Sequence, residues 1–148
     1  MNDNYWMGIA IQEAIKARDE GEVPVGAVLV KNQKLIAQAH NQPILKNDAS
    51  AHAEIQVLRI AGEKTNNYRL NNTIIYVTLE PCIMCLGAIM NARISKIVYG
   101  AHDIKTGACG TCINLSKTKC FNHKIDTKGG ILENKCKKIL QHFFQNKR

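Results

Sequence analysis

The chain has 148 residues, 45% of them hydrophobic, which fits one globular domain spanning residues 1–148. It contains no apolar run near the ~20 residues of a transmembrane helix, and its polar N-terminus lacks a signal peptide's basic segment, so we expect a cytoplasmic protein without membrane contact. The formal net charge of +8, with lysines crowding the last third, suggests a polyanionic partner such as RNA, although a solvated lysine-rich surface gives the same pattern.

The first part of the chain predicts a helix followed by a β-hairpin. Apolar residues recur at helical spacing up to residue 18, with Asp3 or Asn4 as the cap and Gly21 as the end. The apolar run 25–30 is typical of a buried strand, and residues 35–39 return as its hairpin partner after a polar turn.

Helices and strands alternate through the rest of the chain. In order, the expected elements are a polar loop over 40–50, a helix over 51–61, a strand over 73–77, a helix over 82–91, a strand over 94–99, a loop over 100–122 and a helix over 132–144. Ser50 is the candidate N-cap of the second helix, and Gly62 is its candidate end. This order predicts an α/β fold in which helices cover a central mixed sheet, a three-layer α/β/α domain.

Two short motifs, H-x-E at residues 52–54 and P-C-x-x-C at residues 81–85, place metal ligands at two predicted helix starts. His52, Cys82 and Cys85 give three zinc ligands, with the two cysteines on one helix face. Structural zinc sites have four protein ligands, whereas catalytic sites leave one position for water. The sequence therefore predicts one catalytic Zn²⁺ per subunit.

Glu54 is the candidate catalytic residue. It lies two residues from His52, where its carboxylate can take a proton from zinc-bound water, whose pKa the metal lowers to roughly 7. The resulting hydroxide attacks the substrate while Glu54 returns the proton, and general acid–base help of this kind contributes typically ~10²–10⁴-fold. Each motif alone is common on exposed helices, but the two together at helix starts favour the catalytic interpretation.

The segment AHAEI at 51–55 followed by TLEPCIMC at 78–85 resembles the signature of the zinc-dependent nucleobase deaminases. Further segments resemble the bacterial tRNA-specific adenosine deaminases, a family of the cytidine/deoxycytidylate deaminase superfamily, over nearly the whole chain. These segments are EVPVGAV at 22–28, HNQP at 40–43, NYRL at 67–70, GAHD at 100–103 with KTG at 105–107, and the FF pair at 143–144.

The resemblance implies a cytidine-deaminase-like fold and hydrolytic deamination of adenosine to inosine at the wobble position of a tRNA anticodon, usually that of an arginine tRNA. It implies that His52, Cys82 and Cys85 hold the zinc ion and that Glu54 carries the protons. It also implies a homodimer whose two subunits contact the anticodon stem-loop. The apolar segment 86–90 is a candidate interface, although ordinary core packing gives the same pattern.

Substrate contacts from Val25, Asn41, Ala53, Pro81 and Asp103 follow from the same resemblance. The Asn41 amide offers both a donor and an acceptor for a base edge, although a turn role explains this residue equally well. Asp103 matches a position that contacts the sugar and backbone of the target nucleotide. A short Asp in a polar loop is otherwise most often a turn former.

Two further features have less specific interpretations. Cys109 and Cys112 repeat the Cys-x-x-Cys spacing without a matching histidine or further cysteine pair, so we interpret them as loop or core thiols. Phe143 and Phe144 fit base stacking, but two Phe on a terminal amphipathic helix more often lie in a core or an interface.

Two competing functions remain open. A deaminase of a free base or nucleotide, such as guanine, cytosine or deoxycytidylate, has the same zinc chemistry, but the flanking segments and the basic C-terminal part disfavour it. A non-catalytic zinc module that binds RNA needs four permanent ligands and has no need of Glu54. No fourth ligand stands at a sensible spacing in the sequence.

Overall fold

Residues 1–147, the part of the chain that this computed structural model describes, form a five-stranded mixed sheet in the order β2-β1-β3-β4-β5. Its strands are β1 (Gly26–Lys31), β2 (Lys34–His40), β3 (Ile74–Leu79), β4 (Lys96–Ala101) and β5 (Asp126–Lys128). β1 is antiparallel to both β2 and β3, whereas β3, β4 and β5 run parallel. The prediction of a central mixed sheet is confirmed.

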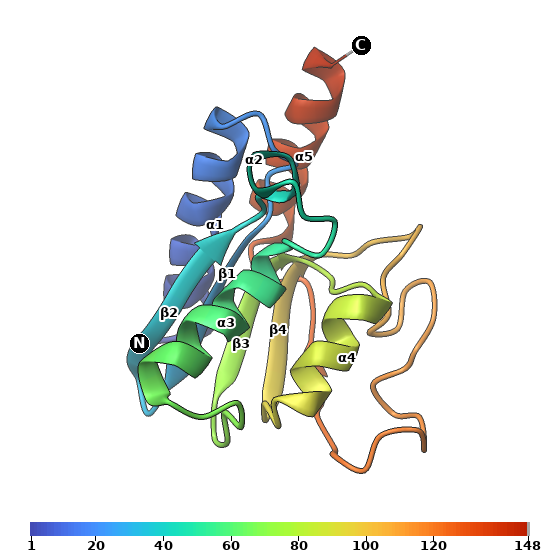
Figure 1. The fold of residues 1–148 in the computed structure, drawn as a ribbon. Coiled ribbons are helices and arrows are strands. Elements are labelled where there is room, and N and C mark those ends of the chain that lie inside the picture. Colours follow the sequence, from blue (N-terminus) through green and yellow to red (C-terminus); the bar gives the residue numbers. More distant parts are fainter. Residues whose placement is uncertain (148) are drawn as a thin grey trace.

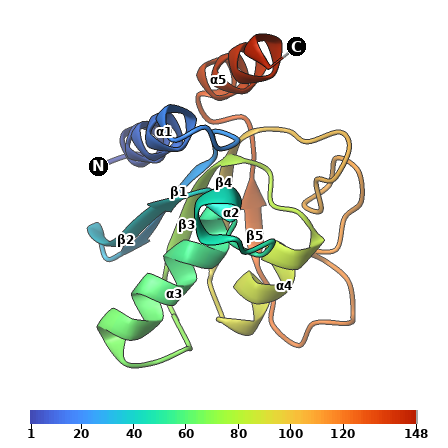
Figure 2. The same cartoon turned by 45° about the horizontal axis from the view of Figure 1, so that its top comes forward.

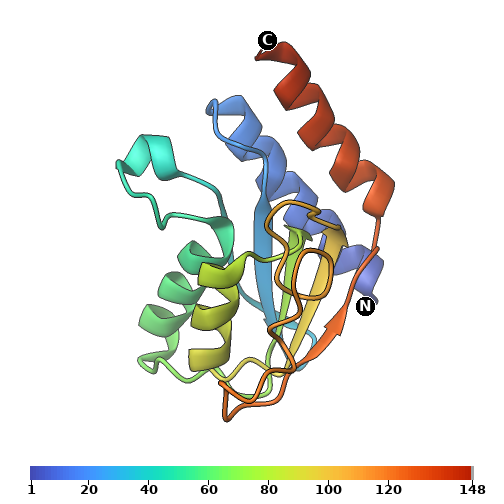
Figure 3. The ribbon, with the colours of Figure 1, turned by 90° about the vertical axis from the view of Figure 1, so that its right-hand side faces the viewer.

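Helices cover both faces of this sheet. They are α1 (Asp3–Asp19), α2 (Pro43–Lys46), α3 (Ala53–Thr65), α4 (Ile83–Asn91) and α5 (Glu133–Asn146). α1 and α5 lie on one face, and α3 and α4 lie on the other (Figures 1 and 2). Figure 3 shows the three layers edge-on, which confirms the predicted α/β/α architecture. Within residues 1–147, no helix combines the length and the apolar character needed to cross a membrane.

Side chains of the central strands are buried on both sides of the sheet. Successive residues of a strand point to opposite faces, so Leu29 packs beneath α3 and α4 while Val28 packs beneath α1 and α5. Full burial of such a side chain contributes about 1.5–3 kcal/mol. α1 packs directly on β1 at Gly26. Only glycine allows this close approach, since a Cβ at this position would collide with the carbonyl oxygen of Ala10.

The predicted ends of the second helix were wrong. The hydroxyl of Ser50 donates to Asp48 instead of capping α3, whose N-cap position is His52. Gly62 lies inside the helix, which continues to Thr65 and ends where Asn66 adopts a left-handed conformation with φ of 52°. Asn tolerates this conformation better than most residues, so the stop comes four residues later than predicted.

Two short elements were not predicted, and one cap was misplaced. β5 consists of three mostly polar residues, and the four-residue helix α2 lies inside the predicted loop 40–50. α1 is capped by Asn2, whose side-chain oxygen accepts a hydrogen bond from the Tyr5 N–H at 3.0 Å, and not by Asp3 or Asn4. None of these differences moves the predicted motifs, since both still begin or precede helices.

The candidate site lies at the carboxyl ends of the parallel strands β3 and β4. α4 connects these two strands, and Leu79 at the end of β3 pairs with Ala101 at the end of β4. In open α/β sheets, ligands bind outside the carboxyl ends of the parallel strands. The starts of α3 and α4 both face this end of the sheet (Figure 1).

Candidate zinc and nucleobase site

The three predicted zinc ligands meet at the starts of α3 and α4. His52 precedes the first residue of α3, Cys82 occupies the N-cap position of α4, and Cys85 lies in the first turn of α4. The Nδ1 atom of His52 is 3.7 Å from the Sγ of Cys82 and 3.4 Å from the Sγ of Cys85. Tetrahedral zinc with bonds of about 2.3 Å to sulfur and 2.05 Å to nitrogen places those atoms about 3.6 Å apart. The donor atoms therefore fit a zinc ion.

The two thiols differ strongly in acidity. A hydrogen bond from the Cys85 side chain, helped by His52 and opposed by burial, lowers the pKa of Cys82 to about 4. The neighbouring Cys82 sulfur and burial raise the pKa of Cys85. Two adjacent anionic sulfurs repel each other in the absence of a cation, and a divalent cation removes that repulsion. The charge of the site is thus matched to a metal ion.

Glu54 lies in the first turn of α3 and is only 4% exposed. Burial raises the pKa of its carboxyl group to about 7, with His52 opposing the shift. A carboxyl group with a pKa near the working pH both accepts and donates protons readily. Glu54 therefore has the environment that its predicted role as proton carrier requires.

A cavity of about 270 Å³ opens beside these groups. Of the predicted residues, it is lined by His52, Glu54, Cys82, Val25, Asn41 and Asp103. Ala53 and Pro81 do not line it among the residues described. Their backbone groups are already used, since the Ala53 N–H donates to Asn41 at 2.9 Å and the Pro81 carbonyl accepts from Ala108 at 2.9 Å. Most of the predicted substrate residues are therefore brought together around one small cavity.

Asn41 and Asp103 have different local roles. The Oδ1 atom of Asn41 accepts the Ala53 N–H, while its Nδ2 makes no protein hydrogen bond within residues 1–147. The carboxylate of Asp103 accepts the N–H groups of Lys105 and Thr106 and also the Thr106 hydroxyl. Asp103 thus acts as a turn former at the cavity wall, and Asn41 presents a donor toward the cavity.

Sequence reasoning missed three polar residues of the cavity region. Glu80 and Thr106 line the cavity themselves. The buried carboxylate of Glu22 accepts the N–H groups of Ile44 at 3.1 Å and Leu45 at 2.8 Å, so it holds the start of α2. All three residues lie in segments that carry the family resemblance, EVPVGAV at 22–28, TLEPCIMC at 78–85 and KTG at 105–107, but the segments alone indicated no individual role for them.

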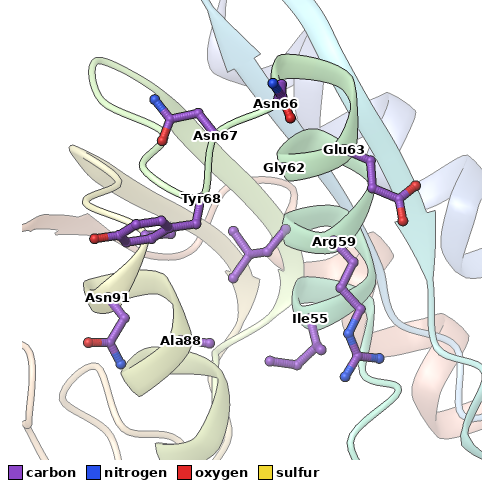
Figure 4. Close-up of a pocket in the computed structure, with 11 residues that line it drawn as sticks. Ile55, Arg59, Gly62, Glu63, Asn66, Asn67, Tyr68, Ala88 and Asn91 are labelled. Carbon is purple, nitrogen blue, oxygen red and sulfur yellow. The ribbon is translucent and has the colours of Figure 1, made fainter.

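A second hollow, about 980 Å³ in volume, lies on the outer surface between α3 and α4. In Figure 4, Ile55, Arg59 and Glu63 come from α3, Ala88 and Asn91 come from α4, and Asn66 to Tyr68 come from the loop after α3. None of the zinc ligands or Glu54 lines this hollow. It is open to an occupant that covers both helices.

Comparison with known proteins places the chain in a family. The family model of MafB19-like deaminases matches residues 1–148. The chain is 49% identical over 150 residues to a tRNA-specific adenosine deaminase of Buchnera aphidicola (strain Sg), covering 99% of this chain and 96% of that protein. It is 44% identical to a tRNA-specific adenosine deaminase of Bacillus subtilis, covering 99% of this chain and 91% of that protein.

A solved structure from a study of A-to-I editing by tRNA:A34 deaminases at the wobble position of transfer RNA matches with a TM-score of 0.89. It is 41% identical in sequence, and the match covers 92% of this chain and 99% of that one. The likeness therefore extends over both sequence and fold. The chain belongs to the MafB19-like deaminases and, among them, to the tRNA-specific adenosine deaminases.

Proposed function

We propose that this protein hydrolyses adenosine to inosine at the wobble position of a tRNA anticodon, of the arginine tRNA type. The observation that carries the proposal is the meeting of His52, Cys82 and Cys85 with the buried Glu54 beside one cavity. The full-length relatives named as tRNA-specific adenosine deaminases support the substrate. We further propose that residues 1–148 form one deaminase domain that works in the cytoplasm.

His52, Cys82 and Cys85 would hold one zinc ion per subunit, which supplies a polarised, more acidic water for attack on C6 of adenine. Glu54 accepts a proton from this water and passes it to ring nitrogen N1. Glu54 then takes the remaining proton from the new C6 hydroxyl group and passes it to the departing amino group. The C6–N bond breaks, ammonia leaves, and the water oxygen remains as the carbonyl oxygen of inosine. A carboxyl with a pKa of about 7 suits both transfers.

The cavity residues supply recognition of the base. Asn41 keeps its amide N–H₂ available as a donor, and the ring nitrogens of adenine are acceptors. Val25 contributes an apolar wall. Ala53 acts by orienting the Asn41 amide, and Pro81 acts by holding the loop at Ala108. Asp103 lies at the wall where the sugar of the nucleotide would lie.

RNA binding is proposed to involve α5. Phe143 and Phe144 are in edge-to-face contact, Lys147 lies over the Phe143 ring, and Phe144 is 49% exposed, so this pair is not core. An exposed aromatic pair beside lysines fits stacking of single-stranded bases. An anticodon loop is already unpaired, so moving its adenosine out of the stack costs little.

We also propose that the protein is a homodimer through the α3–α4 face of Figure 4. The apolar side chains of segment 86–90 were the predicted interface, but Leu86, Ile89 and Met90 are buried in the chain's own core. Ile83 and Met84, by contrast, are exposed on α4, and large exposed apolar groups often mark interfaces. Sedimentation equilibrium should give twice the 16.5 kDa mass of the chain.

The deciding experiment is an assay for inosine in a matched anticodon stem-loop, run beside free adenosine, guanine and cytosine. We expect inosine at the wobble adenosine of the RNA and no product from the free compounds. Deamination of a free base with the RNA unchanged would keep the zinc chemistry and overturn the tRNA assignment. Stable RNA binding without any deamination would favour the non-catalytic zinc module.

A further inference from the structure

Glu80 has a buried carboxylate that the proposed chemistry does not use. It directly follows β3, its side chain is 2% exposed, and it lines the cavity. Its Oε1 accepts the Asp103 N–H at 3.1 Å, and its Oε2 accepts the N–H groups of Cys109 at 3.0 Å and Thr111 at 3.1 Å. Three backbone donors on one buried carboxylate form charge-assisted hydrogen bonds, which are among the stronger ones in proteins.

These three donors belong to the two ends of one loop, residues 103–111, that leaves the carboxyl end of β4. Glu80 itself is anchored to that strand, because its own N–H donates to the Ala101 carbonyl at 2.9 Å. The carboxylate therefore joins β3 and β4 at one side and closes the loop at the other. No other side chain among residues 1–147 accepts the N–H groups of both ends of this loop.

Gly107 shows how tightly the loop closes on this carboxylate. A Cβ at Gly107 would lie 2.5 Å from the Cδ and 2.7 Å from the Oε1 of Glu80, and 2.5 Å from the Asp103 carbonyl oxygen. Real Cβ atoms essentially never make contacts this short, so only glycine lets the chain pass here. Glu80 and Gly107 therefore form one close-packed unit.

The same loop supplies Asp103 and Thr106 to the cavity wall. Asp103 organises its own turn through Lys105 and Thr106, and the loop is attached further along where the Ala108 N–H donates to the Pro81 carbonyl at 2.9 Å. The start is held by the bond from the Asp103 N–H to Glu80. Glu80 thus contributes to the cavity lining and also holds the start of the loop that forms the neighbouring wall.

We propose that Glu80 is a positioning residue that fixes loop 103–111 as the nucleotide-binding wall, so that Asp103 and Thr106 meet the sugar and backbone of the RNA substrate. The inference rests on the proposed function. It predicts that loosening the Glu80 contacts weakens substrate binding and leaves the zinc ligands and Glu54 in place. A purely structural role would instead lower stability without a specific change in KM.

The test is Glu80→Gln, which keeps the shape of the side chain but replaces one acceptor oxygen by an N–H₂ donor. We expect KM for the anticodon stem-loop to rise about tenfold, equivalent to about 1.4 kcal/mol, with kcat within about twofold and zinc content unchanged. Amide hydrogen exchange should become faster at Cys109 and Thr111. Unchanged KM in a folded variant whose loop amides have lost protection would overturn the proposal.

Gly107→Ala provides a second approach from the loop side, because it displaces the loop without altering the carboxylate. It should raise KM in the same way even if Glu80→Gln does not fold. Gly8→Ala is the matched control, since Gly8 lies in α1 with nothing within 4 Å of an added Cβ. An equal rise in KM for the Gly8 and Gly107 variants would contradict the proposal.

A double-mutant cycle with Asp103→Ala separates positioning from general destabilisation. If Glu80 acts through this wall, the effects of Glu80→Gln and Asp103→Ala on KM are strongly non-additive. Fully additive effects would overturn the inference. Failure of the wild-type protein to deaminate the RNA would instead overturn the proposed function, so the two failures are distinguishable.

Discussion

The chain contains the same Cys-x-x-Cys spacing twice, but the two cysteine pairs lie in different surroundings in the fold. Cys82 and Cys85 stand at the start of α4 and face His52 from another helix. Cys109 and Cys112 lie in a loop, where Cys109 is buried and Cys112 is exposed, so their side chains do not share one environment. Two cysteines with this spacing can act together as metal ligands only where the start of a helix orients both sulfur atoms and a third donor from another segment lies close to them.

The acidity of the thiols shows the same contrast. The pKa of Cys82 is lowered to about 4, chiefly by the hydrogen bond from Cys85. Burial, together with the nearby Glu80 carboxylate, raises the pKa of Cys109 to about 12. At neutral pH, Cys82 is therefore a thiolate ready for a metal, whereas Cys109 is a neutral thiol that packs in the core.

The largest expected effect comes from removing a ligand. In Cys82→Ala, zinc content should fall from one per chain to near zero, and deamination should be lost with it, because two remaining donors hold the ion poorly. Inductively coupled plasma mass spectrometry of the purified protein measures this. The matched control is Cys112→Ala, which should retain zinc and activity. A Cys82 variant with full zinc occupancy would refute the ligand set.

Glu54→Ala should have the next largest effect. Turnover should fall by about 10²–10⁴-fold, since the variant removes the proton carrier, while zinc remains at one per chain. Single-turnover rates on the stem-loop, measured beside metal content, check both statements. Joint loss of metal and activity would show that Glu54 supports the zinc site instead of carrying protons.

Removing the metal should change which thiols react. In the zinc-loaded protein, we expect a maleimide to label the exposed Cys112 and Cys120 and to leave Cys82 unlabelled. After chelation, Cys82 should react as well, because it is partly exposed and its pKa of about 4 keeps it ionised at neutral pH. Peptide mass spectrometry identifies the labelled positions. Equal labelling of Cys82 before and after chelation would contradict metal ligation.

The smallest effect concerns the second pair. Cys109→Ala should lower the free energy of unfolding by about 1 kcal/mol, since it removes a buried side chain without opening a large cavity. Urea denaturation measures this value, and Cys112→Ala should change it by no more than about 0.5 kcal/mol. Loss of zinc from either variant would show that the loop pair takes part in metal binding after all.

The sequence predicted those elements that have a strong local signal. The apolar periodicity located α1, the hairpin, α4 and α5 to within a few residues, and the two motifs pointed to the three side chains that come together as a group able to hold a metal ion. β5 has no such signal, because its three residues Asp126–Lys128 are paired only through the edge of β4. β5 therefore forms only because it pairs with β4, a strand that is distant in the chain.

Contacts between distant segments also explain the other misses. The start of α3 was placed too early because its first N–H is capped by Asn41, twelve residues before, and not by Ser50. The role of Glu80 was not predicted, because its hydrogen-bond partners lie 23–31 residues further along the chain. The motif around Glu80 was visible in the sequence, but the hydrogen bonds that define the role of this residue exist only in the folded protein.

The bond between Asn41 and Ala53 has a consequence for how this enzyme can change. One amide group both caps the helix that carries His52 and Glu54 and presents a donor to the cavity. Any replacement that altered the base preference at this position would also loosen the reactive end of that helix. New substrate preferences should therefore arise more easily at Thr106, which lines the cavity but makes no hydrogen bond to the helix start that carries His52 and Glu54.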